Sequence, residues 1–319
     1  MNRLSYEEFL AHGDEFDRAV SRTPEIARFC SSALWQKAAH DTMQQPEEGD
    51  EYFIFEEEGN WIVFAERGGR RIFYPLEAAW MFGSPLIGDP LDCLDLLRRA
   101  TTECLDSPFG FCFGGIRKGG ILHRAIMARR EECLQFEEFP ATDCVGIDLS
   151  GGYDEWLARR SKKFRKSIRQ LRLPEGVSIE DVSRESPGEL FSRIEAVQRE
   201  TYKWAEGIDI FQVETYRKFY RILLEELHDR EDLRILFARR EDSDLAYIFG
   251  GVQNTTYRGF QMSYIEEAKP LGIGNALQLR NLQLRADEGI LHYDLGMHSP
   301  YKERWADRWD EYVGAFLVW

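Results

Sequence analysis

The sequence has no long apolar run and no cysteine pair with the spacing of a metal site. No stretch approaches the roughly 20 apolar residues that a membrane-spanning helix needs, and the first residues lack the apolar core of a signal peptide. The six cysteines form no Cys-x-x-Cys pair and lie mostly within apolar patterns. We therefore expect a cytoplasmic protein with reduced, buried thiols, no metal and no membrane partner.

Positive charge is also scarce. The chain carries 41 Lys and Arg against 56 Asp and Glu, a formal net charge of −15 at pH 7. Residues 1–150 hold 15 basic and 27 acidic side chains, and residues 151–319 hold 26 and 29. Such an acidic surface repels phosphates, which argues against a general nucleic-acid-binding protein. One segment is the exception, because residues 151–172 hold eight basic and two acidic side chains.

The 319 residues are enough for two domains of ordinary size, and 43% of them are hydrophobic. Periodicity predicts helices, three strands, helix, strand, helix and strand in the first half, and the same order in the second half. The pattern therefore predicts a duplicated module. We place one module in residues 1–142, a linking strand and a basic helix in residues 143–172, and a second module in residues 173–319.

The stretch after the predicted strand 259–265 is the most informative in the chain. It reads Lys269-Pro270-Leu271-Gly272-Ile273-Gly274-Asn275-Ala276 and precedes a helical pattern that runs from residue 275 to about 288. A helix that starts after a glycine turn leaves backbone N–H groups unpaired at the positive end of its dipole. Such a place binds phosphate. Glycine at 272 and 274 allows close approach and positive φ, and Lys269 adds a charge.

This order of elements resembles the GNAT acyltransferase superfamily, whose pyrophosphate loop is written Arg/Gln-x-x-Gly-x-Gly/Ala; Lys269 here departs from the usual first residue. The segments 165–169, 293–296 and 301–305 are more narrowly similar to the FemAB-like branch, which has two GNAT modules in tandem. The resemblance covers residues 20–319. It implies an α/β (α+β) fold of two tandem modules, each a mixed, mainly antiparallel sheet flanked by helices.

The resemblance also implies a donor and a set of binding residues. The donor would be acetyl-CoA or another acyl-CoA. Its phosphates would be held by residues of the loop, namely Lys269, Leu271, Gly272, Ile273, Gly274, Asn275 and Ala276. The corresponding stretch of the first module, residues 82–90, contains prolines and an acidic residue, so we expect that module to bind no cofactor.

Transfer from a thioester to an amine requires deprotonation of the ammonium and protonation of the leaving thiolate, without a covalent enzyme intermediate. The resemblance assigns Tyr301 as the general acid. Glu266 and Glu267, at the end of the strand before the loop, and His298, whose imidazole titrates near neutral pH, are alternative bases. Lys302, Tyr264 and Asp294 are expected to bind substrate. A packing tyrosine, solvated acids and a surface histidine remain alternative interpretations.

The sequence favours an N-acyltransferase that acts on an amine of a small molecule or peptide and needs no oligomer. The acidity of residues 1–150 favours a cationic acceptor such as a polyamine. Apolar positions in residues 156–172 form a helical stripe, and the basic positions lie largely elsewhere. That basic face is either solvated or recruits a polyanion, so the alternatives are an aminoacyl-tRNA-dependent FemAB-type transferase and one that uses an acyl carrier protein. A non-catalytic module that binds a phosphorylated ligand is a further alternative.

Overall fold

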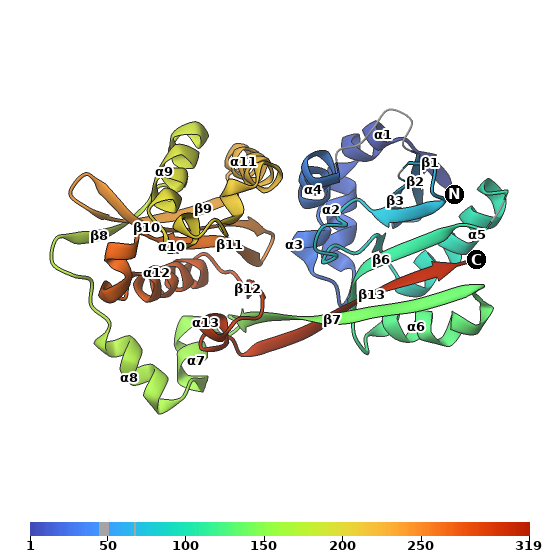
Figure 1. The fold of residues 1–319 in the computed structure, drawn as a ribbon. Helices are drawn as coiled ribbons and strands as arrows, with labels where there is room; N and C mark the ends of the chain where they lie inside the picture. The colour runs from blue at the N-terminus through green and yellow to red at the C-terminus, as the bar shows by residue number, and fades with distance from the viewer. Residues whose placement is uncertain (45–50, 67, 107) are drawn as a thin grey trace. The chain divides into compact units, whose positions relative to one another are not determined.

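The computed structural model describes residues 1–44, 51–66, 68–106 and 108–319 (Figure 1). Two compact units can be distinguished: Met1–Asp143 together with Asp310–Trp319, and Cys144–Trp309. Each unit has a sheet flanked by helices (Figure 1). The expected α/β class, with mainly antiparallel sheets, is confirmed.

The first unit has strand order β1-β2-β3-β4-β6-β13-β7, with β5 beside β3. β4 and β6 pair in parallel, whereas β1 to β4 pair with one another antiparallel in chain order. Its elements are β1 (Asn2–Leu4), α1 (Tyr6–Ala11), α2 (Gly13–Arg22), α3 (Arg28–Ser31), α4 (Ala33–Ala39), a π-helical turn (His40–Gln44), β2 (Tyr52–Glu57), β3 (Asn60–Glu66), β4 (Ile72–Pro75), β5 (Leu86–Ile87), α5 (Pro90–Cys104), β6 (Gly110–Arg117), α6 (Ile121–Arg129), a 3-10 turn (Arg130–Glu132), β7 (Gln135–Asp148) and β13 (Arg308–Val318).

Alternation along β2 and β3 explains why helices cover both faces of this sheet. Phe53 and Phe55 on β2 join the core under α5 and α6, whereas Ile54 between them joins the core under α1, α2 and α4. Successive side chains of a strand point to opposite faces. Because both sets are apolar, the sheet must be covered on both sides, which gives the layered unit.

A buried carboxylate organises the loop between β4 and α5. Glu77 is fully buried and accepts hydrogen bonds from the N–H groups of Trp80, Met81, Phe82 and Gly83 at 2.7–3.1 Å. Burial raises the pKa of this carboxyl, and the four hydrogen bonds oppose that shift. All four partners are N–H donors, an arrangement that favours the carboxylate over the protonated acid.

The second unit has strand order β7-β12-β11-β10-β9-β8. Residues 144–148 of β7 belong to it, and the rest of that strand to the first unit. Its other elements are α7 (Gly152–Arg159), α8 (Lys162–Gln170), β8 (Val177–Asp181), α9 (Pro187–Arg199), α10 (Tyr202–Ala205), a 3-10 turn (Ile210–Gln212), α11 (Glu214–Asp229), β9 (Leu233–Arg240), β10 (Ser243–Gln253), β11 (Thr256–Tyr264), a 3-10 turn (Glu266–Leu271), α12 (Ile273–Asp287), β12 (His292–Met297) and α13 (Pro300–Glu303).

Two layers of helices cover the second sheet (Figure 1). Helix α12 places Ile273 and Leu277 against Leu236 and Ile248 of β9 and β10. Helices α9 and α11 pack on β9, β10 and β11 and appear on the opposite side of the sheet from α12 (Figure 1). The first turn of α12 is thereby fixed at the end of β11.

The basic segment forms two helices instead of the one that the apolar stripe predicts. Helix α7 ends at Arg159, and Ser161 starts α8, because its side chain accepts a hydrogen bond from the N–H of Phe164 at 3.2 Å. Phe164 packs edge-on against Trp305 at 5.4 Å between ring centroids. The break lets both helices bury an apolar side while Lys162, Lys163, Lys166 and Arg169 of α8 stay exposed.

Within the described ranges, no helix is both long and apolar enough to cross a bilayer. The same residues contain no group of three or more His, Cys, Asp or Glu side chains placed to hold a metal ion.

The Glu77 carboxylate should be essential to the first unit. We expect Glu77→Gln to lower the free energy of unfolding by about 2–4 kcal/mol, because the amide group turns an N–H donor toward backbone donors. Urea denaturation followed by circular dichroism measures this. Glu103→Gln, an exposed change on α5, serves as the matched control and should cost less than about 0.5 kcal/mol. Equal stability of the two variants would contradict this role.

Candidate functional site

The site begins where two parallel strands separate. β11 and β12 pair at only three positions, from Thr256 opposite His292 to Arg258 opposite Asp294. Beyond Arg258, the edge of β11 that faces away from β10 has no neighbouring strand in the described part of the unit. The backbone of residues 259–264 therefore borders open space.

Two bulges lie where the strands separate. In β11, Phe260 is the extra residue, because Gly259 pairs with Gly250 and Gln261 pairs with Phe249.

The other bulge is in β12. The register of β12 against β7 shifts between Asp294 and Gly296, and Gly296 has φ +78°, which favours glycine. The Asp294 carboxylate fixes the bulge, since it accepts from the Gly296 N–H at 2.7 Å and from Arg258 Nη1 at 2.6 Å. A bulge bends its strand, so the bulges in β11 and β12 together account for the divergence of the two strands.

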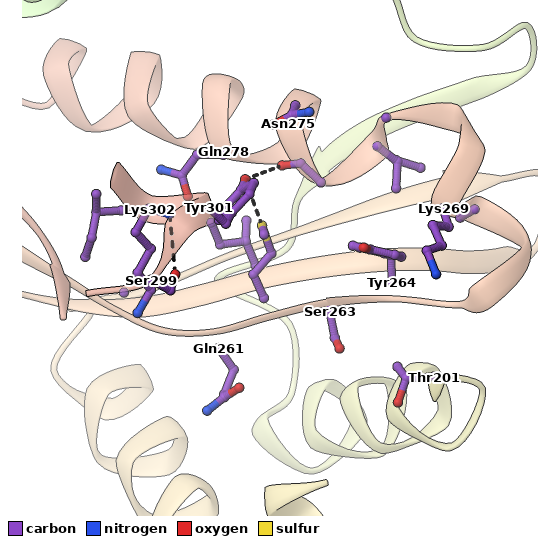
Figure 2. Close-up of a pocket in the computed structure, with 18 of the residues that line it drawn as sticks. Thr201, Gln261, Ser263, Tyr264, Lys269, Asn275, Gln278, Ser299, Tyr301 and Lys302 are labelled. Carbon is purple, nitrogen blue, oxygen red and sulfur yellow. Dashed lines mark hydrogen bonds between the residues drawn. The ribbon is translucent and has the colours of Figure 1, made fainter. Parts of the chain in front are cut away.

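The gap is a cavity of about 580 Å³ that belongs entirely to the second unit. β11 forms one wall, and the first turn of α12 forms another (Figure 2). Polar and charged side chains line much of it: Thr201, Lys203, Gln261, Ser263, Tyr264, Lys269, Asn275, Gln278, Tyr293, Ser299, Tyr301 and Lys302.

The start of α12 is open toward this cavity. Gly272, the residue before the helix, has φ +66° and supplies no side-chain cap. Within the described residues, the N–H groups of Ile273 and Gly274, the first two of the helix, have no hydrogen-bond acceptor. The Asn275 Oδ1 atom is buried there without a partner. The two N–H groups, with the helix dipole behind them, suit an anion such as phosphate, whereas the Asn275 Oδ1 atom can only accept a hydrogen bond.

Only one of the two loop glycines has the positive φ that the sequence suggests. Gly274 lies within the helix, and a Cβ atom there would meet the Tyr264 ring at 3.5 Å, an ordinary contact. Gly272 is the turn residue, and a Cβ atom there would meet nothing within 4 Å. The positive φ angle therefore favours glycine at position 272, although a side chain there would have space.

The first unit also has a helix, α5, at the corresponding position in its order of elements. A side chain of the protein caps the first N–H groups of this helix. Helix α5 comes after β4 and the two-residue strand β5, and the Asp89 carboxylate accepts from the N–H groups of Leu91 and Asp92 at 2.9 and 3.2 Å. In the loop before it, Glu77 occupies four more N–H groups. A phosphate would meet the Asp89 carboxylate at the cap of α5, whereas the cap of α12 is a glycine.

Tyr301 lies at the middle of the cavity and joins α13 to the start of α12. Its hydroxyl donates to the Gly274 carbonyl oxygen at 3.3 Å and lies 3.8 Å from Met262 Sδ (Figure 2). Burial raises the pKa of Tyr301 well above its ordinary value, although Arg304 opposes the shift. The phenol thus keeps its proton at neutral pH.

Lys302 is half-buried and lines the same cavity. Its Nζ donates to the Met297 carbonyl oxygen at 3.0 Å. Burial, and after it the nearby positive charge of Arg258, lowers the pKa of Lys302 to about 8. Lys203 adds to this effect, and Asp294 opposes it.

The structure does not bring all the expected site residues to the cavity. Lys269 lines it and forms an ion pair with Glu266 at 3.1 Å. The expected bases Glu266, Glu267 and His298 do not line it, nor do Leu271, Ala276 and Asp294. The His298 ring packs on Trp309 with 4.8 Å between centroids. Tyr264 does line the cavity beside Gly274.

Several lining residues were not identified from the sequence. Gln261 and Ser263 alternate with Met262 on β11, so a period-2 pattern at a strand end was their only signal. Gln278 lies one helical turn after Gly274 and donates to the Tyr293 hydroxyl at 2.9 Å. Lys203 belongs to a helical turn distant in sequence, and no local pattern indicates it.

Comparisons with known proteins agree with this geometry. Residues 158–303 match the family model described as Acetyltransferase (GNAT) domain. No curated protein matches the sequence.

Solved structures share the fold along nearly the whole chain. FemX is 11% identical, covers 98% of this chain and 97% of its own, and has a TM-score of 0.68. L-PGS from Bacillus licheniformis is 16% identical; the match covers 95% of this chain and 90% of that chain, with a TM-score of 0.55. A tandem GNAT protein from the clavulanic acid biosynthesis pathway is 12% identical; the match covers 99% of this chain and 97% of that chain, with a TM-score of 0.50. At these identities the likeness establishes the fold alone.

Lys302 should titrate at an unusually low pH for a lysine. We expect its Cε signal, followed by NMR on protein with 13C-labelled lysine, to have a midpoint at about pH 8, because burial and Arg258 disfavour the charged form. The Lys302→Met variant identifies the signal by its loss. A midpoint near the ordinary lysine value of about 10.4 would contradict the described environment.

Proposed function

Because residues 158–303 form an acetyltransferase (GNAT) domain, the chain is an acyltransferase, and we propose that it moves an acyl group from acyl-CoA to an amine. The resemblance to tandem GNAT proteins is confirmed by this match and by the shared fold. The donor, the acceptor and the residue roles that follow are part of the proposal.

One observation carries the choice of donor: the open start of α12 in the cavity wall. Its two unpaired N–H groups, Ile273 and Gly274, supply donors for the pyrophosphate of CoA. Lys269 lines the same end of the cavity. In this proposal the donor binds to the second unit, because Asp89 and Glu77 already occupy backbone N–H groups in the corresponding part of the first unit.

Transfer proceeds by direct attack. The amine nitrogen bonds to the thioester carbonyl carbon, the carbon–sulfur bond breaks, and the thiolate takes a proton from the Tyr301 hydroxyl. The proton that the amine loses goes to solvent, and Tyr301 regains one from solvent. The raised pKa of Tyr301 means that the phenol carries its proton at neutral pH.

Deprotonation of the amine needs no carboxylate in this scheme. Neither Glu266, Glu267 nor His298 lines the cavity, so the acceptor binds as the free amine or loses its proton to water. An essential carboxylate base is therefore not part of the proposed mechanism.

A second donor is favoured by one specific feature, the exposed face of α8. Lys162, Lys163, Lys166 and Arg169 are exposed and form no ion pair with described residues. Phe164 anchors this helix against Trp305, four residues after Tyr301. Such a face suits a polyanion, and an aminoacyl-tRNA is the donor that the FemAB-like resemblance implies.

Donor binding should depend on the start of α12. We expect CoA and acetyl-CoA to bind in isothermal titration, and Gly274→Asp to weaken binding by about tenfold or more, because its carboxylate faces the phosphates. Gly274→Asn is the matched control, equal in size but uncharged, and should bind much more tightly than the Asp variant. Equal affinity of all three proteins would contradict the phosphate site.

The same titration separates the two donors. Absence of CoA binding, together with saturable binding of aminoacyl-tRNA that is lost when Lys162, Lys163, Lys166 and Arg169 become Gln, would replace acyl-CoA by aminoacyl-tRNA. Salt should weaken such binding steeply.

Tyr301→Phe should slow turnover without affecting donor binding. Loss of the proton donor is expected to lower kcat by about a hundredfold or more, while the Kd for CoA stays within about twofold of the original. Steady-state release of CoA measures the first quantity, and titration the second. Unchanged kcat would remove Tyr301 from the chemistry, and loss of CoA affinity would make it a binding residue.

A further inference from the structure

Tyr301 lies on a helix that is too short to hold itself in place. Helix α13 has four residues, all of them at least partly exposed, and isolated helices shorter than about 12 residues are marginal in water. The Ser299 hydroxyl caps its first turn, but it accepts from the Lys302 N–H at the long distance of 3.4 Å. Contacts outside α13 are therefore needed to keep Tyr301 at the middle of the cavity.

Aromatic rings hold the chain just after α13, which lies beside α7 (Figure 1). Trp305 is fully buried. Its ring is stacked on that of Trp156 of α7, with 6.3 Å between centroids, and Phe164 of α8 packs edge-on against it at 5.4 Å. These contacts join side chains, so by themselves they do not satisfy the main-chain carbonyl oxygens at the end of the helix.

Arg160, which follows the last residue of α7, binds two of these carbonyl oxygens. Its Nη1 donates to the oxygen of Ala306 and its Nη2 to the oxygen of Arg304, both at 2.6 Å. The guanidinium also lies over the rings of Phe164 and Trp156, at 5.3 and 6.0 Å from the centroids. One side chain thus joins the chain that leaves α13 to the aromatic rings of α7 and α8.

This use of an arginine is costly. Arg160 is half-buried, and burial lowers the pKa of its guanidinium. Both of its hydrogen-bond acceptors are main-chain carbonyls instead of a carboxylate, and among the described residues its Nε atom is buried without a partner. An apolar residue could fill this place without desolvating a charge. What the arginine adds is therefore its pair of hydrogen bonds to the end of α13.

We propose that Arg160 is a positioning residue for acyl transfer: by binding the carbonyl oxygens of Arg304 and Ala306, it holds α13 so that the Tyr301 hydroxyl stays beside the Gly274 carbonyl oxygen in the cavity. This inference rests on the proposed function, in which Tyr301 donates the proton. The extended backbone at Arg160, where α7 ends, is then part of the site. One arginine of the basic segment serves the chemistry, apart from the exposed face of α8.

Arg165 offers a matched control. It is also half-buried, and its Nη1 also donates to a main-chain carbonyl oxygen, that of Ala158, at 2.7 Å, but this oxygen belongs to α7. We expect Arg160→Gln to lower kcat, measured as release of CoA, by about tenfold or more, because a misplaced Tyr301 transfers its proton poorly. The Kd for CoA should stay within about twofold. Arg165→Gln should change neither quantity by more than about twofold.

The conservative variant shows what the planar guanidinium contributes. Arg160→Lys keeps the charge, but a single ammonium cannot join both carbonyl oxygens and stack on the rings. It should therefore restore only part of the kcat that Arg160→Gln loses. A lysine that restores kcat fully would mean that the charge alone matters, and would contradict the positioning by two hydrogen bonds.

A double substitution tests whether Arg160 acts through Tyr301. In the Tyr301→Phe protein there is no proton donor left to position, so adding Arg160→Gln should lower kcat by less than about twofold. The same tenfold loss in both backgrounds would show that Arg160 supports the fold without positioning Tyr301, and would overturn the proposal.

Tyr301 can also be followed without any substrate. Burial is the main cause of its raised pKa; Arg304 and Trp305 oppose the shift, and Tyr264 adds to it. At about pH 10, the ordinary pKa of tyrosine, the Cζ signal of Tyr301 in protein with 13C-labelled tyrosine should still be that of the phenol. The Tyr301→Phe variant identifies the signal by its loss.

Release of α13 would expose the hydroxyl, and its pKa would fall. At the same pH, the Tyr301 signal should therefore move toward that of the phenolate in Arg160→Gln and stay in place in Arg165→Gln. An unchanged signal in an Arg160→Gln protein that keeps the original circular dichroism spectrum would overturn the proposal. If that variant does not fold, the same signal in Arg160→Lys decides, with a smaller shift expected. Because this measurement needs neither CoA nor an amine, absence of turnover would refute the proposed function and leave the role of Arg160 to be decided by the Tyr301 signal.

Discussion

The early separation of β12 from β11 is the constraint on which the rest of the site depends. Two parallel strands that stayed paired would close the gap that the cavity fills. The pairing ends after three residues, where β11 has a bulge at Phe260 and β12 has one between Asp294 and Gly296 that Arg258 holds. Asp294 was expected to bind substrate, but it does not line the cavity. Its carboxylate instead holds the β12 bulge beside the cavity through Arg258 and the Gly296 N–H.

The two helix starts show how one arrangement of elements can serve two purposes. In the first unit, carboxylates of the chain itself occupy the backbone donors: Asp89 caps α5, and Glu77 fills the preceding loop. In the second unit, glycine replaces the capping side chain, and the donors of α12 remain available. The helix dipole is present in both. What differs is whether the protein supplies its own anion, which is a matter of a few side chains.

Sequence reasoning located the loop at residues 269–276 because a glycine turn between a strand and a helical pattern has local signals. It also identified Tyr301, Lys302 and Tyr264, which line the cavity. It could not identify Lys203, which reaches the cavity through tertiary folding, or show that Glu266, Glu267 and His298 lie outside it. The basic segment was expected to form one helix, because periodicity does not register the cap at Ser161. Strand β7 (Gln135–Asp148) runs across the boundary that was expected between residues 142 and 143.

Hydrogen–deuterium exchange of the intact chain tests the central claim most directly, because both helix starts report in the same sample. The account predicts that CoA slows exchange of the amides at residues 272–276 and leaves those at residues 88–92 unchanged. Protection at the start of α5, or protection that avoids the start of α12, would contradict the assignment of the donor site to the second unit.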